Sequence, residues 1–134
     1  MLNPKRLEEE WEHIWQASGE DCKRDAKILE VGSGLGGFIK YVAEQGLESI
    51  GIEIESERVK ISYDYLKVSR TENVFVLECV GEHLPFPSAY FNYVYSTNVL
   101  EHVNDLAAVP GETIRVLKPG GLFQMVVPNY GSWW

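Results

Sequence analysis

The segment Ile28-Leu29-Glu30-Val31-Gly32-Ser33-Gly34-Leu35-Gly36-Gly37 decides the fold of this 134-residue chain. Its first four residues form a short, mainly apolar run, which is typical of a buried strand. Glycines then cluster at 32, 34, 36 and 37, and glycine adopts positive φ angles that other residues avoid. The segment therefore predicts a buried strand followed by a tight turn, whose backbone N–H groups at a helix start can approach a ligand.

Periodic apolar residues surround this turn and predict alternating helices and strands. Residues 1–20 carry an amphipathic helix over 5–18, in which apolar side chains recur at spacings of three and four. A later helix starts at Ser56, where Val59, Ile61, Tyr63 and Leu66 form a helical pattern with blurred periodicity. The residues 97–117 are expected to be helical, with Pro110-Gly111 kinking or splitting that helix. The expected strands are 28–31, 49–54, 74–77, 90–96 and 121–127.

Strands that alternate with helices predict a mostly parallel, doubly wound sheet with helices on both faces. The expected fold class is α/β and Rossmann-like, with about five strands in the sheet. We expect a single domain over 1–134, with a core over 27–128. Ligands of such sheets bind beyond the carboxyl ends of the strands, which is where the glycine turn lies.

The composition is that of an ordinary globular protein, with 45% hydrophobic and 24% charged residues. No apolar run is long enough to cross a bilayer, and the N-terminus lacks the features of a signal peptide. We therefore expect a cytoplasmic protein without a membrane partner. The net charge of −8 disfavours nucleic acid and mildly favours a cationic ligand. Cys22 and Cys79 lack the spacing of a metal site, and no metal is expected.

Glu53 is the second feature that points to a ligand. It ends a predicted strand about twenty residues after the turn, where a carboxylate can accept hydrogen bonds from both hydroxyls of a ribose. Gly32, Gly34 and Gly37 also match the dinucleotide pattern GxGxxG. The turn and Glu53 therefore indicate a nucleoside ligand without naming it. The structural alternatives are a glycine turn that serves only packing and a glutamate that is merely solvated.

Further segments resemble the class I S-adenosylmethionine-dependent methyltransferases, specifically the small-molecule branch called methyltransferase type 11. The resemblance covers about 28–129, and the cofactor it implies is S-adenosylmethionine. Glu30 supports this cofactor over NAD, because dinucleotide turns usually have an apolar residue there. The matching segments are ILEVGSGLGG at 28–37, Glu53, GEHLPFPSAYFNYVYS at 81–96, NVLEHV at 98–103 and IRVLKPGG at 114–121.

The resemblance implies a role for each part of the cofactor site. Glu30 would lie near the methionine amino group and the turn would surround the methionyl moiety, while Glu53 would hold the ribose. Ile54 and the segment 81–84 would enclose adenine, and 96–98 would line the sulfonium side. Val80 replaces an aspartate that commonly binds the adenine amino group, so Glu82 or the backbone alone would take that role. The full set is Glu30, Val31, Gly32, Ser33, Gly34, Gly36, Glu53, Ile54, Gly81, Glu82, His83, Leu84, Ser96 and Asn98.

Three functions from different classes follow from these observations. The first is a methyltransferase acting on a small-molecule acceptor. The second is a catalytically incomplete S-adenosylmethionine-binding or interaction module, because the sequence ends after the fifth strand whereas family members continue through two more. The third is an NAD-binding Rossmann domain. No catalytic residue is assigned, since His13, Glu101 and His102 qualify as bases by residue type alone.

The sequence also raises two expectations about contacts. The helix with Trp11 and Trp15 serves either as a lid or, the favoured interpretation, as a helix packed on the sheet. Self-association is expected through an exposed sheet edge or through the aromatic residues of 130–134, which suggest a truncated chain or a docking surface.

Overall fold

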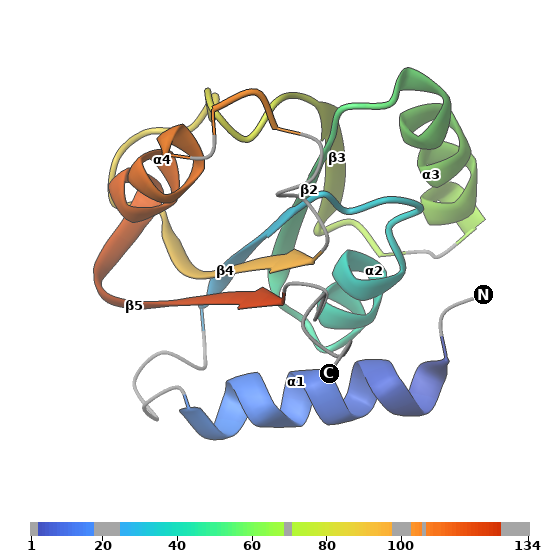
Figure 1. Cartoon of the computed structure of the whole chain (residues 1–134). Helices are drawn as coiled ribbons and strands as arrows, with labels where there is room; N and C mark the ends of the chain where they lie inside the picture. The colour runs from blue at the N-terminus through green and yellow to red at the C-terminus, as the bar shows by residue number, and fades with distance from the viewer. Residues whose placement is uncertain (1–2, 18–24, 69–70, 98–102, 106, 127–134) are drawn as a thin grey trace, which may run out of the picture.

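The computed structural model describes residues 3–17, 25–68, 71–97, 103–105 and 107–126. Four predicted strands agree with the observed ones to within one residue at each end (Figure 1). The predictions for Asn98, Glu101, His102 and the aromatic C-terminus lie outside the described residues. The elements are α1 (Pro4–Ala17), β1 (Lys27–Val31), α2 (Gly37–Glu44), β2 (Glu48–Glu53), α3 (Ser56–Val68), β3 (Val74–Glu78), β4 (Phe91–Thr97), α4 (Ala108–Val116) and β5 (Leu117–Val126).

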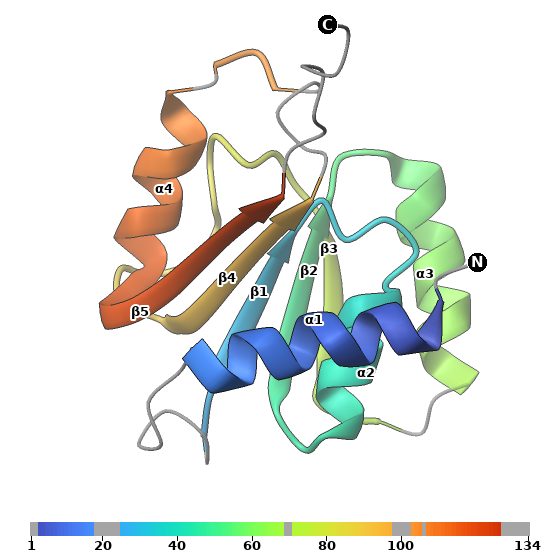
Figure 2. The same ribbon diagram turned by 60° about the horizontal axis from the view of Figure 1, so that its bottom comes forward.

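The strands form one sheet in the order β3-β2-β1-β4-β5, and every neighbouring pair is parallel. From β1 the chain adds strands first on one side and then on the other, so the strand order reverses between β1 and β4. Figure 2 shows the carboxyl ends of the strands meeting at one edge of the sheet. The predicted α/β, Rossmann-like fold is therefore confirmed, and the β1/β4 junction is the place where such folds bind ligands.

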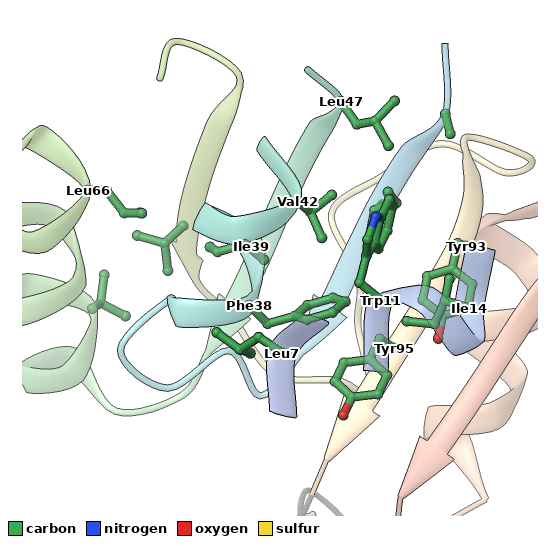
Figure 3. Close-up of a cluster of buried hydrophobic side chains, with 14 residues drawn as sticks. Leu7, Trp11, Ile14, Phe38, Ile39, Val42, Leu47, Leu66, Tyr93 and Tyr95 are labelled. Carbon is green, nitrogen blue, oxygen red and sulfur yellow. The ribbon is translucent and has the colours of Figure 1, made fainter. Parts of the chain in front are cut away.

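Helices cover one face of the sheet through a continuous apolar cluster. Leu7, Trp11 and Ile14 of α1 are buried, and their spacing of four and three places them on one side of the helix. Figure 3 shows Trp11 and Ile14 near Phe38 of α2 and Tyr93 of β4. Trp11 thus has the packed position that the sequence favoured, and α1 crosses the sheet face (Figure 2).

The opposite face is covered by α4 and by the loop that connects β3 to β4. Its apolar cluster contains Leu29 and Val31 of β1, Leu84 of the loop and Val116 of α4. None of the helices over the described ranges is long and apolar enough to cross a membrane. Because α1 and α2 cover one face and the β3–β4 loop covers part of the other, the carboxyl edge of the sheet is bordered by helices on one side and by a loop on the other.

The helix predicted over 97–117 is wrong in detail, because α4 begins only at Ala108. Pro110 and Gly111 lie in the first turn of α4, so they neither kink nor split it. Proline is tolerated there because the first backbone N–H groups of a helix have no intrahelical partner. In α3, Val59 and Leu66 are buried, but Ile61 and Tyr63 are about half exposed.

Ser62 takes the middle position of the buried stripe in α3. Its hydroxyl donates to the backbone carbonyl of Val59 at 2.8 Å, which satisfies the polar group inside the core. Positions 59, 62 and 66 have helical spacing, but because the middle residue is a serine the buried side of the helix does not show as an apolar pattern in the sequence.

The fifth strand starts earlier than 121–127 predicts. It begins at Leu117, directly after α4, and pairs with β4 around a register shift between Phe91 and Tyr93. A Cβ at Gly121 would lie 2.8 Å from the carbonyl oxygen of Lys118, so glycine permits this irregular stretch. The Lys-Pro-Gly-Gly segment, residues 118–121, therefore follows the end of α4 and is already part of β5.

Candidate cofactor-binding site

The glycine turn after β1 has the predicted conformation. Gly32, Gly34 and Gly36 have φ angles of 79°, 55° and 84°, which disfavour residues with side chains. The N–H groups of Gly32 and Ser33 both donate to the carbonyl oxygen of Ile52 at 2.9 Å. The turn is thereby fastened to the end of β2, and α2 begins directly after it.

Glu53 lies beside this turn and is 5% exposed, so the alternative of a merely solvated glutamate does not apply. Its Oε2 accepts a hydrogen bond from the N–H of Gly34 at 2.9 Å, and its Oε1 accepts one from Glu55 at 3.0 Å. These bonds fix the direction of the carboxylate. Because a carboxylate has about four acceptor positions, each oxygen can accept a further bond from a ligand.

Buried polar side chains gather where β1 and β4 end. Ser96 pairs in register with Val31, and Ser33 follows in the turn. The hydroxyls of Ser33 and Ser96 are buried, and neither has a hydrogen-bond partner among the described residues. Buried polar groups normally have a partner, so these two indicate a ligand or water at this place. Glu30, 5% exposed, adds a carboxyl group to the same edge.

Gly51 makes room for Ser33 on the neighbouring strand. A Cβ at Gly51 would lie 2.5 Å from both the Cβ and the Oγ of Ser33 and 2.8 Å from the Cδ1 of Ile39. Distances under 3.0 Å require something to shift. The sequence analysis did not single out Gly51, because this residue of β2 matters through its contact with Ser33, which lies in the turn between β1 and α2.

The loop after β3 forms the other border of the site. The N–H of Cys79 donates to the carbonyl oxygen of Glu53 at 3.0 Å. Gly81 is buried, and a Cβ there would lie 3.3 Å from Val31 and 3.5 Å from Val109. This part of the predicted adenine segment therefore lies against the ends of β1 and β2.

The other predicted adenine contacts have different surroundings. Leu84 is 5% exposed and packs in the apolar cluster with Val31 and Ile52, so it supports the loop. His83 is exposed, and Ile54 is 50% exposed. Their contacts with a cofactor stay predictions.

Glu82 is engaged with the segment that follows β4. Its Oε1 accepts a hydrogen bond from the N–H of Asn104 at 2.9 Å. Hydrogen bonds from the backbone N–H groups of Glu82 itself, Asn104 and Asp105 lower the pKa of this carboxyl group. The carboxylate is thus held in its charged form, and its substitution for the missing acid at Val80 stays a prediction.

Glu112 and Arg115 of α4 are the polar residues near the site that the sequence analysis missed. They form an ion pair with an Nε–Oε1 distance of 2.7 Å, and both contact the backbone of the β3–β4 loop. An acid and a base three positions apart on a helix are common on solvated helix faces. The sequence therefore offered no signal that this pair faces a loop.

Groups of three or more metal-ligating side chains are absent from the part of the chain that the structure describes. The polar groups at the carboxyl edge are the backbone groups of the glycine turn, the carboxyl groups of Glu30 and Glu53, and the hydroxyls of Ser33 and Ser96. Such groups recognise the hydroxyl, amino and carboxylate groups of an organic cofactor.

Residues 29–125 match the family model described as a methyltransferase domain. The ubiquinone biosynthesis O-methyltransferase of Yersinia enterocolitica is 30% identical over 134 residues, covering 98% of this chain and 53% of that protein. The sterol 24-C-methyltransferase erg6 of Schizosaccharomyces pombe is 33% identical over 104 residues, covering 75% of this chain and 27% of that protein.

The fold is similar to the crystal structure of YcgJ from Bacillus subtilis, with a TM-score of 0.74 and 25% sequence identity. That match covers 86% of this chain and 48% of YcgJ. The chain thus spans about half or less of the length of these relatives. Because the methyltransferase-domain match includes most of the chain, with the glycine turn and all the strand ends of the site, the chain belongs to the class I S-adenosylmethionine-dependent methyltransferases.

Proposed function

We propose that this domain binds S-adenosylmethionine at the carboxyl ends of β1, β2 and β4 and transfers its methyl group to a small-molecule acceptor. S-adenosylmethionine is the cofactor of the family. The observation that carries the proposal is the buried carboxylate of Glu53, fixed by Gly34 beside a positive-φ glycine turn at the point where strand order reverses.

The residues of the site fit this cofactor. Glu53 offers acceptors for the ribose hydroxyls, and the glycine turn leaves the backbone open to the methionyl moiety. The buried hydroxyls of Ser33 and Ser96 have no partner among the described residues. Ser33, on the turn, would lie near the methionyl moiety, and Ser96, at the end of β4, would line the sulfonium side. Gly81, packed against Val31, borders the adenine position. Glu30 would face the methionine amino group.

The bound cofactor supplies a methyl group that a sulfonium has already activated for in-line displacement. The residues of the chain then have to align the two reactants and exclude water. Glu53 and the turn would hold the nucleoside and methionyl ends, and the apolar clusters on both faces of the sheet support the strands that carry them. No covalent nucleophile is needed, and we assign no base.

The acceptor class is supported by the relatives. One is named as a ubiquinone-biosynthesis O-methyltransferase and another as a sterol 24-C-methyltransferase. Both names refer to small organic acceptors, but the transfer goes to oxygen in one and to carbon in the other. We therefore propose a small organic molecule as the acceptor class and leave the acceptor atom to the experiment.

Calorimetry with S-adenosylmethionine and with NAD tests the cofactor. We expect S-adenosylmethionine to bind and NAD not to bind. Glu53→Ala should weaken S-adenosylmethionine binding by about 1.5–3 kcal/mol, the range for a hydrogen bond to a charged group. The control is Glu57→Ala, which removes an exposed carboxylate from α3. Tight NAD binding without S-adenosylmethionine binding would refute the proposal, and unchanged affinity in Glu53→Ala would refute the role of Glu53.

Methyl transfer from labelled cofactor to a panel of quinols, phenols, amines and sterols tests the activity. Labelled product with at least one acceptor class is the expected result. If the cofactor binds but no acceptor is methylated across the panel, the domain is a cofactor-binding module instead of an enzyme.

A further inference from the structure

The loop between β3 and β4 is held by two charged side chains from α4. Oε2 of Glu112 accepts a hydrogen bond from the N–H of Leu84 at 2.8 Å. The guanidinium of Arg115 donates to the carbonyl oxygen of Leu84 at 2.9 Å and to that of Phe86 at 2.8 Å. Both backbone polar groups of Leu84 are therefore bonded to charged partners.

Glu112 and Arg115 also hold each other. Nε and Nη2 of Arg115 donate to the two carboxylate oxygens of Glu112 at 2.7 and 2.9 Å. Hydrogen bonds from Arg115 and, to a smaller extent, from the N–H of Leu84 lower the pKa of Glu112 to about 2. Charged, bidentate pairs of this kind are stronger and more directional than neutral hydrogen bonds. The two side chains thus form one rigid unit on the loop side of α4.

The held loop also touches the candidate cofactor site. At its start, Cys79 is bonded to the backbone of Glu53, the proposed ribose ligand. Gly81 follows, packed between Val31 of β1 and Val109 of α4. The stretch 81–83 therefore lies between attachments at the end of β2 and at Leu84, and Glu82 within it is also bonded to Asn104. Loss of the contacts at Leu84 would loosen the loop on the side where adenine is proposed to bind.

We propose that Glu112 and Arg115 are positioning residues for the cofactor, which hold Leu84 and Phe86 so that 81–83 lie ready against the ends of β1 and β2. This inference rests on the proposed binding of S-adenosylmethionine at that edge. A loop that is already ordered spares the cofactor the entropic cost of ordering it on binding. Glu112 and Arg115 themselves bind the loop and do not have to touch the cofactor.

Arg115→Lys is the variant that tests the inference. Lysine keeps the positive charge beside Glu112, but a single ammonium cannot reproduce the fork that holds two carbonyl oxygens and a carboxylate. Calorimetry should show S-adenosylmethionine binding about tenfold more weakly if the loop then has its binding conformation about a tenth of the time. Glu112→Gln should weaken binding in the same direction. The matched control is Lys67→Ala, which breaks the exposed Asp64–Lys67 pair, also three residues apart on a helix.

Hydrogen exchange measured by mass spectrometry separates positioning from general stability. In free Arg115→Lys we expect exchange in peptides covering 79–86 to accelerate more than exchange in β1 and β4, and protection to recover when cofactor is added. An equal acceleration in 79–86 and in all strands would overturn the inference, because the pair would then act only on the stability of the whole fold. Equal cofactor affinity of wild type and Arg115→Lys would overturn it as well. A wild-type protein that does not bind S-adenosylmethionine would instead refute the proposed function, and the inference with it.

Discussion

The two faces of the sheet are covered in different ways. On one face, α1, α2 and α3 bury a cluster that includes Ile39 and Tyr95, and the contacts are almost entirely apolar. On the other face, the loop after β3 adds polar contacts, in which Glu112 and Arg115 bond its backbone. A helix satisfies its own backbone groups and needs only an apolar side, whereas a loop needs partners from outside. The loop face is therefore the one whose backbone is held by single polar side chains.

The largest expected effect concerns the helical face. Ile39→Ala should lower the free energy of unfolding by about 2–5 kcal/mol, because Ile39 is fully buried and alanine would leave a cavity. Ile61→Ala is the control, since Ile61 is 53% exposed on α3 and its loss should change stability by less than about 0.5 kcal/mol. Urea denaturation measures both values. Similar losses in the two variants would contradict the assignment of this face as the apolar core.

Gly51→Ala tests how closely the helical face and the glycine turn approach β2. The added methyl would collide with Ser33 and Ile39, and we expect a loss of about 1–3 kcal/mol in urea denaturation. Gly111→Ala provides the comparison on α4, where no atom lies within 4 Å of the added Cβ. Alanine there should be neutral or stabilising by up to about 1 kcal/mol, as helix propensity predicts. A neutral Gly51→Ala would show that the turn can move away from β2.

The contribution of the loop face to the free energy of unfolding should depend on pH, whereas the contribution of the apolar helical face should not. The pKa of Glu112 is lowered from 4.5 to about 2, so its stabilising contribution is complete above pH 4.5 and is lost as pH falls toward 2. Glu112→Gln should therefore be less stable than wild type by about 1.5 kcal/mol at neutral pH. This difference should shrink as the pH falls from 4.5 to about 2.

Urea denaturation of wild type and Glu112→Gln along a pH series measures that difference. Ile39→Ala is the reference, because no proton is involved in its stability loss and its difference from wild type should stay constant. A Glu112→Gln difference that is equally constant would mean that the charged form of Glu112 does not support the loop.

The smallest expected effect lies at β3, an edge of the sheet among the described strands. Phe75 and Leu77 are exposed there, and the hydroxyl of Tyr63 donates to the carbonyl oxygen of Val76 at 3.1 Å. Tyr63→Phe should lower stability by about 0.5–1.5 kcal/mol and free an acceptor of the edge strand for pairing.

Sedimentation velocity should then show more self-association of Tyr63→Phe than of wild type. Tyr65→Phe on the same helix is the control, and we expect it to sediment like wild type. Equal sedimentation of all three proteins would show that Tyr63 does not protect the edge.

Much of the fold could be predicted because its signals are local. The strand before the glycine turn, the turn's positive φ angles and the placement of Glu53 at the end of β2 all follow from a few adjacent residues. The periodicity of α3 was blurred in the sequence because its buried stripe contains Ser62, which satisfies its hydroxyl within its own helix. Pro110 was misjudged because the helix was expected to run over 97–117, which places the proline in its interior, whereas α4 begins at Ala108 and a proline breaks a helix only beyond its first turn.

The sequence by itself determined the α/β alternation, the glycine turn and the family, because period, glycine placement and motif order are properties of neighbouring residues. The tertiary structure decided which polar groups meet. It placed Glu53 on the N–H of Gly34, left the hydroxyls of Ser33 and Ser96 buried at the strand ends, and brought Glu112 and Arg115 onto the β3–β4 loop. These contacts join residues from different elements, and their geometry exists only once the sheet has assembled and its two faces have been covered.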